Sequence, residues 1–254
     1  MLIALTRPVS PTIGDCALTF MERQRIDPAR AEQQHQAYEA CLRTMSVQVV
    51  SLPPAPDLPD AVFVEDTAVV VDEVAVMAAP PLALRRQEVA SVGDILSRYR
   101  EMRSIEGSAT LEGGDVLRVG RTLYIGLSAR TNREGVEQLA TILRPYDYQI
   151  RAVRFDGCLH LKSACTYVGR GTLLINRAWL DPGEIGEFAT IEVVEDEPHA
   201  ANVLAVGETL LMPASFPQTR ARLERAGFQV MTVNLSELQK AEAGVTCCSI
   251  LLQE

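Results

Sequence analysis

Apolar and polar positions along the chain follow a repeating order. Residues 60–80 hold two Val-rich runs that divide at Asp72–Glu73, which indicates two short strands joined by a turn. Residues 84–100 then carry apolar side chains at helical spacing, and 103–107 are expected to form a short strand. This stretch of the chain predicts a module of strand, strand, helix and strand.

The same module recurs with a period of about 40 to 50 residues, as in propeller-like arrays. The second copy turns near Gly120, and Thr131 or Asn132 caps its helix. The third turns at Gly169–Gly171 and has only weak helical signals, whereas the fourth turns at Gly207–Glu208 and has a clear helix. The four modules begin near Asp60, Thr110, Leu159 and Ala201.

The two ends of the chain supply the parts of a fifth module. The C-terminal run 244–253 is expected to pair with the N-terminal run 2–8, and a helix over 28–45 and a strand over 47–54 complete the unit. The pairing closes a ring of five units around one axis. We therefore expect a single α/β domain over residues 1–254.

Composition narrows the function. The chain has 254 residues, 47% of them apolar, and a formal charge of -9, which disfavours nucleic-acid and anionic-membrane partners. The apolar start of the chain is too short for a signal-peptide core, and acidic residues interrupt every long apolar run. The six cysteines include no C-x-x-C, so we expect free thiols in a reducing compartment, the cytoplasm.

Polar residues recur at the same position within the modules. Each module is predicted to place chemically active side chains in its first strand, and these strands would line the axis. The residues concerned are Glu65 and Asp66, Glu112 and Asp115, His160 and Lys162, Asn202, and Cys247. Five distant stretches would thus deliver acids, an imidazole, an amide and a thiol to one cleft.

Cys247, His160 and Glu112 can fill the three roles of a cysteine nucleophile site. A thiol needs a base or a cation to become a thiolate, histidine is its usual partner, and an acid orients the histidine. Strand alternation would turn Cys248 away from the axis and into packing. The other two histidines are expected elsewhere, with His35 on a helix surface and His199 in a loop.

The acids indicate the charge of the substrate. Carboxylates raise the pKa of a nearby thiol, so their crowding around Cys247 favours a substrate that brings a cation, and a guanidinium pairs with carboxylates in a bidentate way. Arg85 and Arg130 lie in the initial regions of predicted helices and could hold a substrate carboxylate, whereas Arg86 is expected at the surface. Asp60, which follows a proline, could instead be a solvated turn residue.

Several motifs closely resemble the dimethylarginine dimethylaminohydrolase family of the guanidino-group-modifying superfamily. They are "LPDAVFVEDT", "LRRQE", "LEGGDVL", "GLSARTN", "LHLKS", "AAN" and "GVTCCS", which lie in the family's order across nearly the whole chain. The resemblance implies a five-bladed α/β propeller of ββαβ modules. It also implies hydrolysis of Nω-methylated arginine to citrulline and a methylamine, through a covalent thiouronium intermediate, with no metal or organic cofactor.

The resemblance assigns a role to each matching position. Cys247 is the nucleophile, His160 the general acid and base, and Glu112 its supporting acid. The resemblance places substrate contacts at Asp60, Glu65 and Asp66 for the guanidinium, Arg85 and Arg130 for the carboxylate, and the backbone carbonyls near Leu18 and Ala241 for the α-amino group. The stretch 9–20, with Gly14 as a hinge, resembles a lid that closes over the substrate.

Other functions remain open at the level of sequence. Arginine deiminase is the nearest alternative, but such enzymes usually carry an acid where this chain has Lys162, and they have an added helical domain. Hydrolases of citrulline or agmatine, a cysteine peptidase and a propeller binding protein of the ribosome anti-association type are further alternatives. The sequence leaves open the preferred methylarginine, whether the protein is a monomer or a homodimer, and whether zinc inhibits it at Cys247 and His160.

Overall fold

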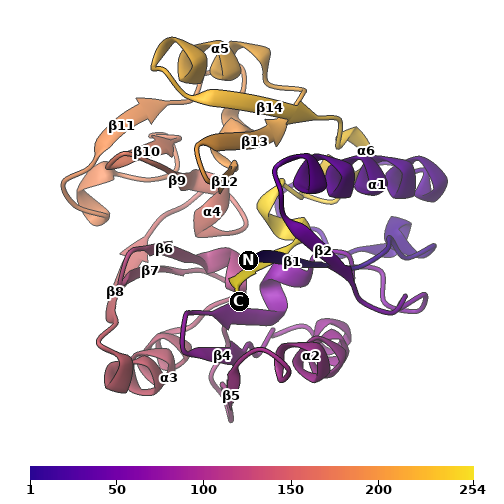
Figure 1. Ribbon diagram of the computed structural model, residues 1–254, viewed down its shortest axis with the longest axis vertical. Helices are drawn as coiled ribbons and strands as arrows, with labels where there is room; N and C mark the ends of the chain where they lie inside the picture. Colours follow the sequence, from indigo (N-terminus) through magenta and orange to yellow (C-terminus); the bar gives the residue numbers. More distant parts are fainter.

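The computed structural model describes residues 1–254 as five three-stranded sheets arranged around one axis (Figure 1). In every sheet the middle strand pairs antiparallel with one neighbour and parallel with the other. The antiparallel neighbour precedes the middle strand in a hairpin, except in the fifth sheet, where it is the C-terminal strand. This order confirms the predicted α/β propeller.

The elements of the first four units follow the predicted repeat. The first two units contain β3 (Ala68–Val70), β4 (Val74–Met77), α2 (Ala83–Leu96) and β5 (Glu101–Ser104), then β6 (Val116–Val119), β7 (Thr122–Leu127), α3 (Arg133–Leu143) and β8 (Gln149–Arg154). The next two contain β9 (Cys165–Gly169), β10 (Thr172–Ile175) and β11 (Ala189–Glu192), then β12 (Leu204–Val206), β13 (Thr209–Pro213), α5 (Pro217–Arg225) and β14 (Gln229–Val233). The third unit has only a short 3₁₀ turn where the others have a helix, in agreement with its weak helical signal.

The fifth unit joins the two ends of the chain. It contains β15 (Ile250–Gln253), β1 (Leu2–Thr6), α1 (Pro28–Thr44) and β2 (Gln48–Ser51). Strands β1 and β15 pair from Leu2 opposite Gln253 to Leu5 opposite Ile250, and the termini lie side by side (Figure 1). The predicted ring closure is therefore confirmed.

The helices begin where local capping chemistry favours a start. Asp27 accepts hydrogen bonds from the amides of Ala29 and Arg30 ahead of α1, and Pro28 occupies the first helical position, where it needs no donor. Asn132 caps α3 by accepting from the amide of Gly135. No helix of the protein is both long and apolar enough to cross a membrane.

The functional residues lie one step earlier than the sequence predicts. They do not belong to the first strand of each module but lie in, or directly beside, a single helical turn that precedes it. These turns are Val64–Thr67, Gly113–Asp115, Leu161–Ala164 (α4), Pro198–Ala201 and Thr246–Cys248. A tight turn has a smaller rise per residue than an extended strand, so it places more side chains within the same distance along the axis.

The expectation for His35 was wrong. His35 lies on the buried face of α1 and is only 1% exposed. Helical periodicity aligns it with Ala31, Tyr38 and Leu42, which pack into the core beneath the fifth sheet. The polar residues on either side of His35 in the sequence suggest a surface position, but on a helix these neighbours point in other directions than His35.

Candidate active site

A small cavity on the axis collects side chains from several units. It encloses about 20 Å³ and is bounded on one side by the N-terminal loop. The residues that line it are Ala17, Asp60, Phe63, Asp66, Arg85, Arg130, Leu159, His160, Ala241, Glu242, Ala243 and Cys247. The structure thus brings together the thiol, the imidazole, two acids and both arginines that the sequence singles out.

The imidazole of His160 is held by a buried carboxylate. Nε2 of His160 lies 2.7 Å from Oε2 of Glu112, and both side chains are buried. His160 immediately precedes α4, whose first amide, that of Leu161, donates to Asp115 over 3.0 Å. Glu112 also pairs with Arg130 over 3.3 Å. The ring therefore has a fixed orientation, with a carboxylate that stabilises its charged form.

Electrostatics keep this imidazole protonated near neutrality. Burial alone would lower the pKa of His160, but the carboxylates of Asp66, Asp115 and Glu112 outweigh burial and raise it to about 9. The positive charges of His160 and Arg85 overcome the effect of burial on Asp66 and lower its pKa to about 2. At neutral pH the site thus holds an imidazolium beside an ionised Asp66.

Cys247 faces the cavity while its neighbour does not. The amide of Gly244 donates to Sγ of Cys247 over 3.4 Å, whereas Cys248 is fully buried in the apolar core. Burial, followed by the charges of Glu65 and Asp66, raises the pKa of the Cys247 thiol to about 12. The two cysteines differ as predicted, but the cause is a 3₁₀ turn, in which successive residues point about 120° apart, rather than strand alternation.

Both predicted carboxylate-binding arginines are buried and already paired. Arg85 donates to Asp66 over 2.6 Å, to the carbonyl of Phe63 over 2.8 Å and to Glu88 over 2.9 Å. Arg130 bridges Glu112 and the hydroxyl of Thr19. Their charge keeps the cavity from being uniformly negative. Arg86, by contrast, binds the carbonyl of Pro80, away from the cavity.

Asp60 is a site residue and not a solvated turn residue. It is 6% exposed, lines the cavity and accepts from the amide of Ala17 over 3.2 Å. Burial raises its pKa, although Arg85 opposes this effect. The ionised form of a carboxylate in this position is stabilised when a cation enters the cavity.

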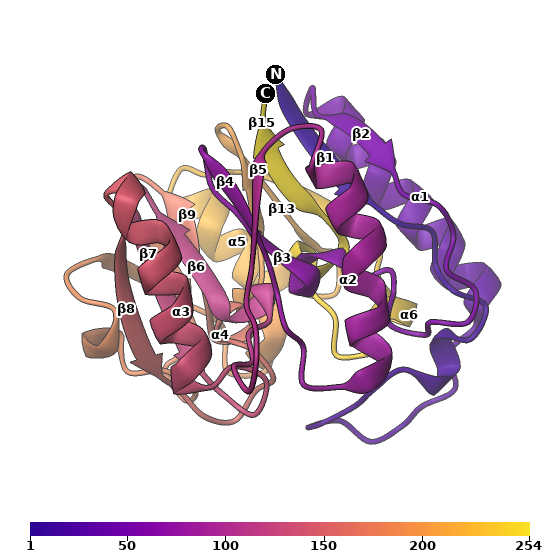
Figure 2. The same cartoon turned by 90° about the horizontal axis from the view of Figure 1, so that it is seen from below.

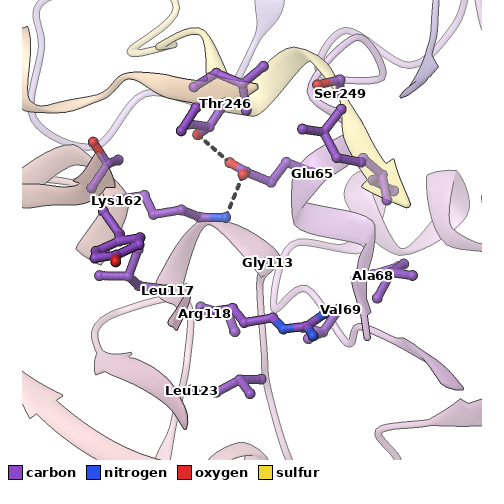
Figure 3. Close-up of a pocket in the computed structure, with 18 of the residues that line it drawn as sticks. Glu65, Ala68, Val69, Gly113, Leu117, Arg118, Leu123, Lys162, Thr246 and Ser249 are labelled. Atoms are coloured by element: carbon purple, nitrogen blue, oxygen red, sulfur yellow. Dashed lines mark hydrogen bonds and ion pairs between the residues drawn. The ribbon is translucent and has the colours of Figure 1, made fainter. Parts of the chain in front are cut away.

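Glu65 and Lys162 form an ion pair across the axis beneath the catalytic cavity. Figure 3 shows Lys162 and Thr246 directed toward the carboxylate of Glu65 from opposite sides. The Thr246 hydroxyl donates to Glu65 over 2.7 Å, and Asn202 binds both the amide and the hydroxyl of Thr246. Asn202 also donates to the carbonyl of Lys162. Side chains from four units thereby fix Thr246, the residue that precedes Cys247.

A second chamber of about 370 Å³ lies on the far side of this pair. Its walls are mostly apolar and include Val71, Leu123 and Leu251, with Glu65 and Lys162 at its end. Glu65 therefore lines this chamber and not the cavity that contains Cys247. Its predicted contact with the guanidinium stays a prediction, because the carboxylate is occupied by Lys162 and Thr246 in the structure.

Leu18 also stays outside the cavity wall, in the half-buried N-terminal loop, whereas Ala241 lines the cavity. The contacts of their carbonyls with the α-amino group stay a prediction. Sequence reasoning missed Thr246 and Glu242. Thr246 is adjacent to Cys247, but its neighbours in sequence give no sign of the Asn202 contact. Glu242 follows Ala241, and only its backbone conformation, with φ at 59°, marks it as unusual.

The oxygen and nitrogen atoms of Asp66, Glu112 and His160 lie within 4.8 Å of one another, a spacing that a metal ion could bridge. Both carboxylates are already neutralised, Asp66 by Arg85 and Glu112 by Arg130. A divalent cation here would have to displace two buried arginines. The residues present therefore fit a metal poorly.

A thiol, an imidazole and a carboxylate on the axis of a five-unit α/β propeller define a cysteine-dependent enzyme of the guanidino-group-modifying superfamily. Residues 18–252 match the family model described as N,N dimethylarginine dimethylhydrolase, eukaryotic. The chain belongs to the dimethylarginine dimethylaminohydrolase family.

Individual relatives agree with the family model. An N(G),N(G)-dimethylarginine dimethylaminohydrolase of Pseudomonas aeruginosa is 37% identical over 235 residues, which cover 92% of each chain. One of Streptomyces coelicolor is 36% identical and covers 99% of this chain and 97% of its own. A crystallised cysteine-to-serine mutant of the Pseudomonas aeruginosa enzyme, complexed with citrulline, superposes with a TM-score of 0.92 at 33% identity, over 98% of both chains.

Proposed function

We propose that the protein hydrolyses Nω-methylated L-arginine to L-citrulline and a methylamine. The observation that carries the proposal is the composition of one cavity, in which Cys247 and the His160–Glu112 pair meet the carboxylates of Asp60 and Asp66. The names of the relatives, and the citrulline complex of one of them, support the same reaction.

The reaction proceeds in two halves. The Cys247 thiolate attacks the guanidinium carbon, and the bond from that carbon to the methylated nitrogen breaks as His160 gives this nitrogen a proton. The product of this half is an S-alkylthiouronium on Cys247 and a free methylamine. Water then attacks the same carbon and gives a proton to His160, after which the carbon–sulfur bond breaks and releases citrulline.

The pKa values indicate how the nucleophile is activated. With a pKa of about 12, the Cys247 thiol is neutral in the free protein, while His160 already carries its proton. A guanidinium bound between Asp60, Asp66 and the sulfur places a positive charge beside the thiol. This charge lowers the thiol's pKa, so that the thiol gives its proton to water and becomes the thiolate. The substrate therefore helps to activate the thiol that attacks it. A neutral molecule of similar shape would not lower the thiol's pKa in this way.

The ion pair of Lys162 with Glu65 favours a methylated guanidinium over an unmethylated one. Lys162 occupies the position where arginine deiminases usually carry an acid, and its amine is bound to Glu65. Fewer free carboxylates then face the guanidinium, which leaves fewer acceptors for N–H groups and more room for methyl groups.

The substrate is tested by measuring citrulline release from asymmetric dimethylarginine, monomethylarginine, arginine and agmatine, without added metal. We expect turnover of the methylated arginines, and preference for arginine or agmatine would refute the proposal. Cys247→Ser should abolish turnover. Cys248→Ser is the matched control: it should stay active and lose about 1 kcal/mol or more of stability, because its hydroxyl is buried among apolar groups.

The compartment is also a proposal. All six cysteines are free in the structure, and four of them are fully or almost fully buried. A nucleophilic thiol needs reducing conditions to stay active. We therefore propose the cytoplasm as the place of action, and localisation of a tagged chain by cell fractionation tests this.

A further inference from the structure

The N-terminal loop has few apolar contacts over the active site. Ile13 and Cys16 bury its start and Ile26 buries its end, but no residue from 17 to 25 is buried. In Figure 2 this indigo loop runs along the lower edge of the molecule, below α6 (Ser236–Gln239). Hydrogen bonds must therefore hold the exposed stretch in place.

Four side chains from outside the loop supply these bonds, and one of them, Lys240, donates to the carbonyl of Arg25 over 3.1 Å. Asp60 accepts from the amide of Ala17, and Arg130 donates to the hydroxyl of Thr19. Both are predicted substrate ligands, so a bound substrate would compete with the loop for their hydrogen-bonding capacity. The fourth, Glu242, has no other side-chain partner.

The carboxylate of Glu242 receives three consecutive backbone amides of the loop. Thr19 donates over 3.0 Å, and Phe20 and Met21 each donate over 2.5 Å. Successive amides that converge on one anion form a concave binding site, and a charged acceptor roughly doubles the strength of each bond. The contact crosses more than two hundred residues of sequence, so local folding does not explain it.

The backbone of Glu242 shows that a glutamate is costly at this position. It has a φ of 59°, three residues after the end of α6, in the left-handed region that glycine and asparagine adopt most readily. A side chain in the left-handed region adds steric strain, and such strain persists where the surrounding structure or function requires the residue. The carboxylate contact with the loop is the feature that only this side chain supplies.

The contact also fixes the groups predicted to bind the substrate's α-amino group. The Thr19 amide and the Leu18 carbonyl belong to one planar trans peptide, so holding the amide fixes the direction of the carbonyl. Ala241 and Glu242 share a peptide in the same way. A single side chain thereby ties both predicted carbonyl contacts together.

We propose that the lid comprises residues 17–25 rather than 9–20 as expected from the sequence, and that Glu242 is a positioning residue that binds it in its closed state and thereby sets the affinity for the amino-acid end of the substrate. The inference rests on the proposed function for the nature of the substrate, but not for the lid contact itself. When the carboxylate is lost, the closed lid becomes less populated, and apparent substrate affinity falls with that population.

The experiment compares Glu242→Gly with the wild type. Glycine removes the carboxylate and relieves the left-handed strain, so the fold should be retained. Trypsin reports the lid directly, because Arg23 and Arg25 are exposed within it. We expect cleavage in the lid to accelerate by about tenfold or more, and KM for dimethylarginine to rise by about tenfold with a smaller change in kcat.

Two further variants separate charge from strain. Glu242→Gln keeps one acceptor but loses the charge, and should fall between the wild type and glycine in both measurements. Asp147→Gly relieves a left-handed residue with φ of 60° that is exposed and outside the lid, and should change neither. Melting temperatures confirm that each variant is folded.

The outcomes are separable. Equal cleavage rates for Glu242→Gly and the wild type would overturn the lid contact, and faster cleavage with an unchanged KM would overturn its link to substrate affinity. If the wild type turns over no methylated arginine, the proposed function fails, whereas the cleavage rates still decide whether Glu242 holds the lid.

Discussion

At the scale of single residues, the charge of His160 is the most informative property of the site. Its pKa of about 9 lies above its ordinary value, so the ring is protonated at neutral pH and loses its proton as the pH rises past about 9. The first half of the reaction needs that proton for the leaving amine. We therefore expect kcat/KM for dimethylarginine to fall as the pH increases above about 9.

Glu112→Gln should move this descending limb. The amide can still accept from Nε2 but no longer stabilises the imidazolium, so the pKa of His160 should fall, and the limb should move to lower pH by roughly one to three units. Glu137→Gln, which alters an exposed glutamate of α3, is the control and should leave the profile unchanged. An unchanged profile in Glu112→Gln would show that His160 is not the titrating group.

Residue types indicated which side chains could carry the reaction, but not which side chains pair with one another across the units. Cys247, His160 and Glu112 could be selected because a thiol, an imidazole and an acid recur at one phase of the repeat. Glu65 could not be distinguished from Asp66, because its pairing with Lys162 is a contact between units 97 residues apart. Such a contact depends on how the units close around the axis, which no local pattern encodes.

At the scale of elements, the short turns before the first strands carry the site. Gly114 belongs to one of them, and a Cβ there would lie 2.5 Å from Nδ1 of His160 and 2.7 Å from Oδ1 of Asp66. Gly114→Ala should therefore displace the imidazole. We expect citrulline release to fall by a factor of about a hundred or more, since small misplacements of catalytic groups have such costs, with a loss of about 1–3 kcal/mol in stability.

Gly93→Ala is the matched change in a regular element. Gly93 lies inside α2, and a Cβ there would meet the Met77 side chain at an ordinary 3.6 Å. Alanine favours the helix by up to about 1 kcal/mol, so the melting temperature should rise by about 2–4 °C with activity retained. Calorimetry and citrulline release measure both variants, and a fully active Gly114→Ala would contradict the predicted geometry.

The helices and most strands could be predicted because apolar spacing and capping residues act locally. The turns could not, because a single helical turn is too short to show a periodicity, and its residues read as the continuation of a strand. The sequence therefore places Glu65 and Asp66 in the first strand of their module, whereas this strand, β3, begins only at Ala68.

At the scale of the whole molecule, the ring is held shut by β1 and β15. The amide of Glu254 donates to the carbonyl of Met1 over 2.9 Å, so a short linker can join the two ends. A circular permutant opened in the exposed turn between Gly207 and Glu208 breaks no strand. It should fold, retain activity within about tenfold and melt a few degrees lower, because termini at exposed turns are well tolerated.

The matched control opens the same unit within its central strand, between Leu210 and Leu211. Both residues are buried, and the cut separates a strand that pairs on both edges. This permutant should be insoluble or unfolded by circular dichroism. If both permutants behaved alike, the fold would not depend on an unbroken central strand in this unit.

The position of the two chain ends has a practical consequence. They lie at the top of the molecule in Figure 2, while the lid over Cys247 lies at the bottom edge. A bead, electrode or optical fibre coupled through either end would leave the mouth of the catalytic cavity facing the liquid. Tethering by the termini therefore offers a way to use the protein as an oriented, reusable detector layer for its substrate.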